Sequence, residues 1–186
     1  EFMNMVWTLR AEEAEKQALK KVFENLDADQ SGALSPKELK RAVTLNTHKI
    51  IPLLADFPIL KDTILNPKKL TKVFEGADID QNKEIDFQEF YDYVFVLRRD
   101  FAFNKCLQDV FDFIDADSGQ SLTRRELQNA LILHADSIKP MLQDFPEISG
   151  VLMKPSKVMR FFEEADDDNS GEINVNEFIT VIKSIL

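Results

Sequence analysis

Asp166-Asp167-Asp168-Asn169-Ser170-Gly171-Glu172-Ile173-Asn174-Val175-Asn176-Glu177 is the stretch that decides the fold of this chain. Oxygen-bearing side chains stand at positions 1, 3, 5, 9 and 12, and the glycine at position 6 permits a sharp turn. Ca²⁺ takes roughly six to eight oxygen ligands, and a loop of this pattern supplies them, with a backbone carbonyl at position 7 and a bidentate glutamate at position 12. The stretch therefore predicts a calcium loop rather than a plain acidic turn. Its predicted ligands are Asp166, Asp168, Ser170, Glu172, Asn174 and Glu177.

The chain also repeats itself without a gap at a spacing of 88 residues, the distance from Asp78 to Asp166. The same shift superimposes residues 56–58, Asp-Phe-Pro, on residues 144–146, which have the same sequence. This internal repeat indicates two homologous units. We expect two lobes, residues 1–97 and 98–186, each with two loops.

Three further twelve-residue loops follow from this repeat, at residues 27–38, 78–89 and 115–126. None of the four loops matches the strict motif for such sites, because position 5 is serine in loops 1 and 4 and the other two loops depart at or near position 6. Lys83 replaces the glycine of loop 2, and loop 3 has Gly119 at position 5 and Gln120 at position 6. The predicted ligands, including the position 7 carbonyls, are Asp27, Asp29, Ser31, Ala33, Ser35 and Glu38 in loop 1, Asp78, Asp80, Asn82, Glu84, Asp86 and Glu89 in loop 2, and Asp115, Asp117, Ser121, Thr123 and Glu126 in loop 3.

The segments beside the loops have the apolar spacing of helices. A phenylalanine stands four residues before every loop, and apolar residues recur after every terminal glutamate. Position 8 is apolar in all four loops, which allows a short two-stranded pairing within each lobe. The position 8 residues are Leu34, Ile85, Leu122 and Ile173.

Helix capping is an alternative explanation for part of the pattern. Ser35 and Glu38, like Asn174 and Glu177, have the spacing of a capping box at a helix N-terminus. Capping does not explain an Asp-x-Asp pair that begins eight residues before each cap. The two interpretations are compatible, since position 12 opens the helix that leaves the loop.

Together these loops resemble the EF-hand superfamily, in particular the four-loop, two-lobed calmodulin-like and sarcoplasmic calcium-binding proteins. The resemblance covers residues 19–186 and departs from the family pattern at Lys83, Gly119 and Gln120. It implies an all-α fold of four helix–loop–helix units paired into two lobes. It also implies Ca²⁺ at the predicted ligands, with competition from Mg²⁺.

The connector within each lobe is longer than a calmodulin-like lobe needs, and the two connectors together contain six of the seven prolines. Proline disfavours helix in the residue before it, so each proline predicts an element boundary. The apolar segments 50–57 and 138–145 predict one extra short helix in each lobe, and Asn66-Pro67 predicts the start of the next helix. Each extra helix either completes the core of its lobe or acts as a built-in lid on a groove. The prolines form three repeat-matched pairs, Pro52 with Pro140, Pro58 with Pro146 and Pro67 with Pro155.

Two longer helices are expected outside the connectors. Residues 89–115 contain neither proline nor glycine and carry apolar residues at helical spacing, which predicts a long helix between the lobes. Residues 11–26 predict an amphipathic helix before loop 1.

Composition narrows the function further. The net charge of −10 disfavours nucleic acid as a partner, and Cys106 is the only cysteine, which agrees with a reduced compartment. No apolar run reaches transmembrane length, and we expect a cytoplasmic location, with association to vesicles or the cytoskeleton left open.

Three classes of function are weighed. The first is a calcium sensor that binds a target protein, and the second is a buffer or storage protein that barely changes shape. An enzyme is set aside, because no nucleophile motif or phosphate-binding glycine loop is present and the carboxylates serve as ligands. Five methionines argue against an adaptable groove, and fifteen phenylalanines argue for a firm core. The sequence favours a calcium-binding signalling protein, with a buffer as alternative, and specifies neither target nor oligomeric state.

Overall fold

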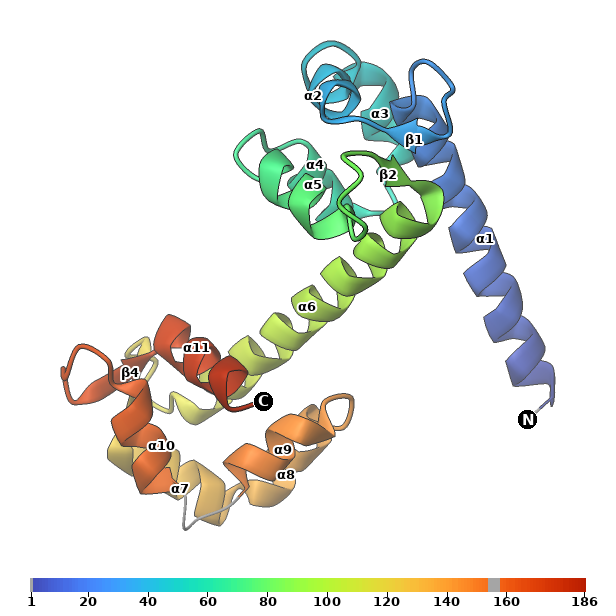
Figure 1. The fold of residues 1–186 in the computed structure, drawn as a ribbon. Helices are drawn as coiled ribbons and strands as arrows, with labels where there is room; N and C mark the ends of the chain where they lie inside the picture. Colours follow the sequence, from blue (N-terminus) through green and yellow to red (C-terminus); the bar gives the residue numbers. More distant parts are fainter. Residues whose placement is uncertain (1, 154–157) are drawn as a thin grey trace. The chain divides into compact units, whose positions relative to one another are not determined.

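The computed structural model describes residues 2–153 and 158–186 and is helical apart from two short strand pairs (Figure 1). The predicted all-α fold class is confirmed. The helices are α1 (Phe2–Leu26), α2 (Pro36–Leu45), α3 (Thr47–Leu53), α4 (Pro58–Ile64), α5 (Leu70–Ala77), α6 (Phe87–Ile114), α7 (Arg124–Leu133), α8 (Ala135–Met141), α9 (Pro146–Leu152), α10 (Val158–Ala165) and α11 (Val175–Ile185).

The chain divides into two compact units, Glu1–Arg99 and Asp100–Leu186, here called the N-lobe and the C-lobe. Each lobe has its own apolar core, built from residues of its two helix–loop–helix units and of its connector helices. α6 passes through the boundary and supplies the last helix of the N-lobe and the first helix of the C-lobe. α1 is longer than predicted, since it begins at Phe2.

Aromatic rings before and after the loops hold each core together. In the N-lobe the Phe23 ring lies 5.6 Å from the rings of both Phe87 and Phe90, measured between centroids. In the C-lobe the Phe178 ring lies 5.7 Å from Phe111 and 5.8 Å from Phe161. These edge-on and tilted contacts join helices on the two sides of the loops and add to the stabilisation from burial.

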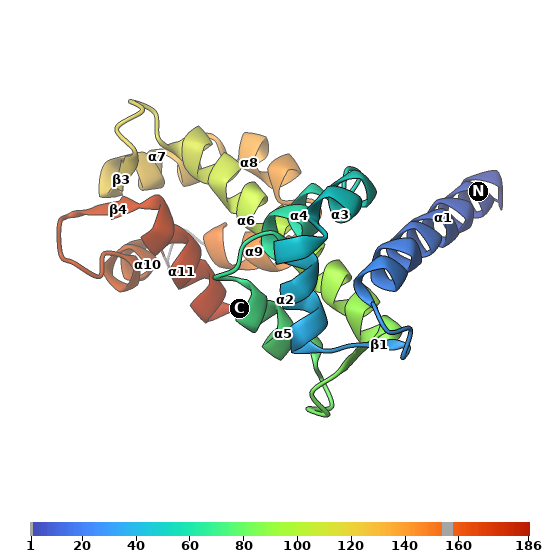
Figure 2. The same cartoon turned by 90° about the horizontal axis from the view of Figure 1, so that it is seen from above.

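One short antiparallel strand pair joins the two loops of each lobe. β1 (Ala33–Leu34) pairs with β2 (Ile85–Asp86), and β3 (Ser121–Thr123) pairs with β4 (Glu172–Asn174). Figure 2 shows β3 and β4 side by side. The position 8 residues meet across these pairs, as predicted, with Leu34 opposite Ile85 and Leu122 opposite Ile173, and all four are buried.

Each connector forms two helices where one was predicted, α3 and α4 in the N-lobe and α8 and α9 in the C-lobe. Pro58 and Pro146 each stand at the first position of a helix, where the missing N–H removes no bond. Phe57 and Phe145 before them are not helical, with φ and ψ of −125° and 65° at Phe57 and −135° and 67° at Phe145, so each connector is broken in the middle. α3 packs against α1 and α2, and α8 packs against α7.

Two of the predicted boundaries are wrong. Pro52 and Pro140 lie inside α3 and α8, next to the last residue of each helix. A proline there removes only one intrahelical bond, and the nearby Ile50 and Ile138 are fully buried, so packing outweighs the local preference.

The predicted helix start at Asn66 is also wrong, because α5 begins at Leu70. Asn66 instead holds a turn before α5, since its Oδ1 accepts from the Lys68 backbone N–H at 3.0 Å and its carbonyl from the Lys69 N–H at 2.9 Å. The equivalent Pro155 lies outside the described residues.

Candidate metal centres

Each of the four loops gathers three carboxylates, from positions 1, 3 and 12. In every loop, one oxygen from each of the three lies within 4.8 Å of the others. Oxygens that bind one Ca²⁺ at about 2.3–2.6 Å lie no more than about 5 Å apart, so these separations suit a single ion. The four groups are Asp27, Asp29 and Glu38; Asp78, Asp80 and Glu89; Asp115, Asp117 and Glu126; and Asp166, Asp168 and Glu177.

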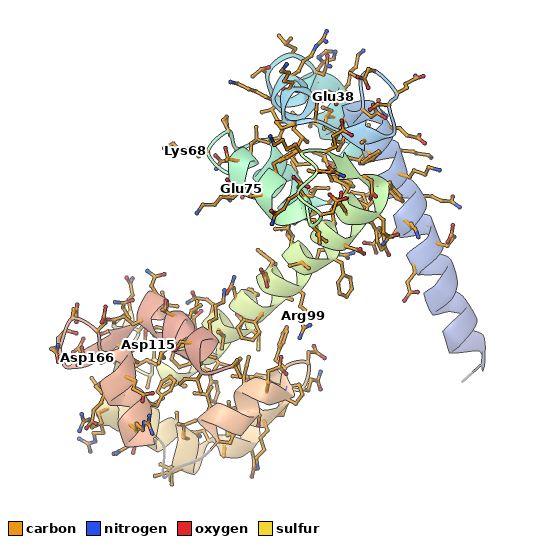
Figure 3. All side chains as sticks on the ribbon, in the orientation of Figure 1. Glu38, Lys68, Glu75, Arg99, Asp115 and Asp166 are labelled. Carbon is orange, nitrogen blue, oxygen red and sulfur yellow. The ribbon has the colours of Figure 1, made fainter. Side chains whose placement is uncertain are left out.

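The aspartate at position 1 accepts hydrogen bonds from backbone N–H groups further along its own loop. Asp27 accepts from the backbone N–H groups of Ser31 at 3.1 Å and Gly32 at 2.9 Å. Asp115 accepts in the same way from Gly119 and Gln120, both at 2.9 Å. These bonds place the position 1 carboxylate inside the turn, close to the position 3 and position 12 carboxylates of the same loop. Figure 3 labels two of these aspartates, Asp115 and Asp166, on the C-lobe.

Position 6 takes a left-handed backbone conformation in every loop. The φ angles are +88° at Gly32 and +85° at Gly171, and Lys83 and Gln120 adopt the same region at +70° and +66°. A residue with a Cβ atom is strained there by roughly 1–2 kcal/mol, so loops 2 and 3 carry a strain that loops 1 and 4 avoid.

Position 4 is left-handed as well, which was not predicted from the sequence. Asparagine tolerates this conformation, so Asn169 was a usable signal, but glutamine and serine give none. The position 4 φ angles are +58° at Gln30, +59° at Gln81, +59° at Ser118 and +56° at Asn169.

The position 12 glutamates also cap the helices that leave the loops. Glu38 and Ser35, Glu126 and Thr123, and Glu177 and Asn174 form reciprocal capping boxes. In loop 2 the Glu89 carboxylate accepts from the Asp86 N–H at 2.9 Å, and Asp86 accepts from the Glu89 N–H at 2.8 Å. One glutamate oxygen thus fixes the helix N-terminus, and the other is left to face the loop.

The hydrogen bonding of that second oxygen, Oε1, differs from loop to loop. In loop 1, Oε1 of Glu38 accepts from the Ala28 N–H at 3.0 Å, and in loop 2, Oε1 of Glu89 accepts from the Ile79 N–H at 2.9 Å. In loop 3, Oε1 of Glu126 is buried and has no hydrogen-bond partner within the described part of the chain. Oδ1 of Asp78 in loop 2 is buried and unpaired in the same sense.

The buried carboxylate oxygens that lack a hydrogen-bond partner indicate whether a cation fits these loops. Leaving a buried polar atom unsatisfied costs about 1–3 kcal/mol, and more when the group is charged. A Ca²⁺ ion held among the oxygens of Asp78 or Glu126 would remove this cost. The donor set consists of hard oxygen atoms, the kind that Ca²⁺ and Mg²⁺ prefer.

The remaining predicted ligands lie in the same loops. The Ser31 hydroxyl donates to the Ala33 carbonyl, and the Ser170 hydroxyl donates to the Glu172 carbonyl, each at 3.0 Å. In loop 2, Oδ1 of Asn82 accepts from the Glu84 N–H at 2.7 Å. Positions 5 and 7 are therefore neighbours in these loops, whereas Gly119 leaves loop 3 without a side-chain oxygen at position 5.

Hydrogen bonding favours the charged form of several ligands. Side-chain and backbone hydrogen bonds from Ser31 lower the pKa of Asp29, and those from Ser170 lower the pKa of Asp168. Burial raises the pKa of Glu38, but hydrogen bonds from Ser35 and the N–H groups of Ala28 and Asp29 outweigh it, so the net shift is downward. These carboxylates are ionised at neutral pH, as metal ligands must be.

Comparison with known proteins agrees with this geometry. A family model described as an EF-hand domain pair matches residues 16–95 and again residues 105–183, so the chain belongs to the EF-hand family, and the predicted resemblance is confirmed. EF-hand domains bind calcium, and four carboxylate groups of this chain have the matching arrangement.

Two relatives illustrate the range of the family. The chain is 28% identical over 174 residues to calcium-binding protein SPEC 2C of Strongylocentrotus purpuratus, covering 92% of this chain and 93% of that protein. It is also 28% identical over 171 residues to calcium-dependent protein kinase 2 of Zea mays, covering 92% of this chain but 27% of the kinase. The chain thus spans about a quarter of the length of the kinase relatives. Across residues 2–153 and 158–186, no helix is both long and apolar enough to cross a membrane.

Proposed function

We propose that the chain is a Ca²⁺-responsive regulatory protein that holds Ca²⁺ in four loops, through the twenty-three predicted ligand positions. The observation that carries this proposal is the double role of the position 12 glutamate. Each such glutamate belongs to one of the four clusters of three acidic residues, and it also caps the helix that leaves its loop. An ion that draws the glutamate inward therefore acts directly on that helix.

The C-lobe supports this reading through Glu126. Its Oε2 is held at 2.9 Å by the Thr123 N–H, while its buried Oε1 lacks a partner. An ion in loop 3 would give Oε1 a partner and would pull on the first turn of α7. Mg²⁺ can occupy the same oxygens, although its strict octahedral geometry suits a bidentate glutamate less well.

The connector helices limit how far such a movement exposes apolar surface. Phe57 and Phe145 are each 8% exposed, and the Phe145 ring lies 5.2 Å from the Phe103 ring in an edge-on contact. Ile50 and Ile138 beside them are fully buried. We propose that the connectors serve as plugs: calcium alone produces a modest response, and a target protein must displace a plug to bind. Because only molecules with a displaced plug can bind the target, the apparent affinity for the target is lower.

A calcium buffer is the alternative function. The observation that favours it is the N-lobe, where Oε1 of Glu38 and Oε1 of Glu89 already bond to the start of their own loops. Such glutamates need to move little when an ion binds. Under either function the chain acts without catalysis and in the cytoplasm.

A calcium titration followed by calorimetry and by a hydrophobic dye tests the proposal. We expect tight binding with compaction, a higher melting temperature and a small gain in dye fluorescence. Binding without any change in helix content, dye signal or hydrodynamic radius would favour the buffer, and absence of calcium binding would overturn both functions.

A further inference from the structure

The two loops of the C-lobe are joined by a hydrogen bond between side chains. The Ser121 hydroxyl of loop 3 donates to the carboxylate Oε2 of Glu172 in loop 4. In the N-lobe, Ala33 occupies the repeat position of Ser121 and has no donor, although Glu84 matches Glu172. The repeat thus gives one lobe a link between its loops that the other lobe cannot form.

This link lies beside the predicted metal ligands. Ser121 and Glu172 are the position 7 residues of loops 3 and 4, and position 7 offers its backbone carbonyl to the ion. Both residues belong to the β3–β4 pair, in which three residue pairs align, compared with two in β1–β2. Restraining either side chain therefore restrains a backbone segment that carries a ligand.

Loops 3 and 4 are unequal partners. Loop 3 lacks a side-chain oxygen at Gly119 and strains Gln120 at φ +66°, whereas loop 4 has Ser170 and Gly171 at these positions. At equilibrium, loop 4 should therefore bind calcium more tightly than loop 3 and fill at a lower calcium concentration. An ion there would order the segment around Glu172, and Glu172 would then hold Ser121 in place for the second ion.

We propose that Ser121 is a positioning residue that couples occupancy of loop 4 to occupancy of loop 3. The proposal rests on the proposed calcium sites and adds how two of them communicate. Ordering shared by two sites lowers the entropic cost of the second binding event, and the coupling acts equally in both directions.

The N-lobe should show weaker coupling between its sites. There, the position 12 glutamates Glu38 and Glu89 bond to the start of their own loops. Each of these glutamates closes its own loop, and Ala33 has no side-chain donor for a further bond between the loops. We therefore expect loops 1 and 2 to bind more nearly independently.

The test is Ser121→Ala in the full chain, which removes the hydroxyl and keeps the backbone carbonyl. Glu38→Gln and Glu89→Gln in both reference and variant weaken the N-lobe sites, so calorimetry reports on the C-lobe. We expect the second C-lobe step to weaken about three- to tenfold and the Hill coefficient to fall toward one, while the first step changes less than twofold. Ser121→Thr should restore the coupling.

A matched gain-of-link variant uses the other lobe. Ala33→Ser, with Glu126→Gln and Glu177→Gln silencing the C-lobe, places a hydroxyl donor at the repeat position of Ser121, with Glu84 at the repeat position of Glu172, and we expect the coupling between loops 1 and 2 to rise. Equal C-lobe constants and Hill coefficients with and without the Ser121 hydroxyl would overturn the proposal. So would a uniform loss of both steps accompanied by a lower melting temperature without calcium, which indicates a merely structural role. Absence of calcium binding in the unmodified chain would overturn the proposed function instead.

Discussion

Lys83 and Gln120 show how a single residue sets the quality of a loop. Both hold the left-handed conformation that glycine adopts freely in loops 1 and 4. The Lys83 N–H nevertheless donates to Asp78 Oδ2 at 3.1 Å, so the turn forms in spite of the strain. Loop 2 offsets part of this cost with four ligand carboxylates, and loop 3, which lacks both a glycine at position 6 and a ligand at position 5, should be the weakest site.

Lys83→Gly should tighten calcium binding at loop 2. Removing a strain of roughly 1–2 kcal/mol favours the ordered loop, so we expect affinity to rise by up to about tenfold. Calorimetry on the full chain measures the change. Lys83→Ala is the control, because it removes the charge and keeps the Cβ atom. An equal gain from both variants would show that charge, not conformation, limits this loop.

Cys106 should be a slow nucleophile in the folded protein. Burial, with smaller contributions from Asp109 and Asp144, raises the pKa of its thiol, which donates to the Met141 carbonyl at 3.2 Å. The native thiol holds its proton to higher pH than the unfolded thiol. This contribution to stability is therefore present below the ordinary thiol pKa and is lost as pH rises toward the native value.

Alkylation kinetics check this prediction. At mildly alkaline pH we expect slower modification of Cys106 in the native protein than in urea, and a faster native reaction in Asp144→Asn. Equal rates in native and unfolded protein at every pH would contradict it.

At the scale of elements, the loops and their flanking helices were predictable and the connectors only partly so. Ligand spacing determines both the turn and the helix that starts at Glu38 or Glu126, so local sequence is enough. The position at which α3 ends depends on the burial of Ile50. A proline at position 52 is compatible both with a helix that ends before it and with a helix that continues through it. The left-handed conformation at Gln30, Gln81 and Ser118 also lay beyond prediction, because the whole loop imposes it on residues without such a preference.

The plugs make a prediction at this scale. Phe57→Ala and Phe145→Ala should raise hydrophobic-dye fluorescence in calcium, because each removes a buried ring that would otherwise fill the opened lobe. Each should also destabilise its lobe by about 3 kcal/mol or more. Ile51→Ala is a matched control, since Ile51 lies in the same connector but is 38% exposed. A large dye signal in the unmodified protein, unchanged by these substitutions, would indicate an open sensor without plugs.

At the scale of the whole molecule, ion binding changes the charge balance. The chain carries −10, and four Ca²⁺ ions would bring the formal charge to −2. Neutralising clustered carboxylates removes their mutual repulsion, so stability should rise with calcium by mass action. We expect at least three ions per chain by calorimetry and a higher melting temperature that a chelator reverses. One site or none at millimolar calcium would refute this stoichiometry.

The hydroxyl hydrogen bonds within loops 1 and 4 affect the rate at which these loops bind calcium. Ser31 and Ser170 each donate to the position 7 carbonyl of their own loop, so two oxygens that an arriving ion needs are bonded to each other. That hydrogen bond must break before both oxygens can coordinate the ion, which slows calcium binding to loops 1 and 4. Gly119 has no hydroxyl, so loop 3 has no such step. A brief calcium pulse would therefore fill loop 3 early, and sustained calcium would fill the stronger loops. Stopped-flow mixing should resolve two phases, with the fast phase retained in Ser170→Gly and lost in Glu126→Gln.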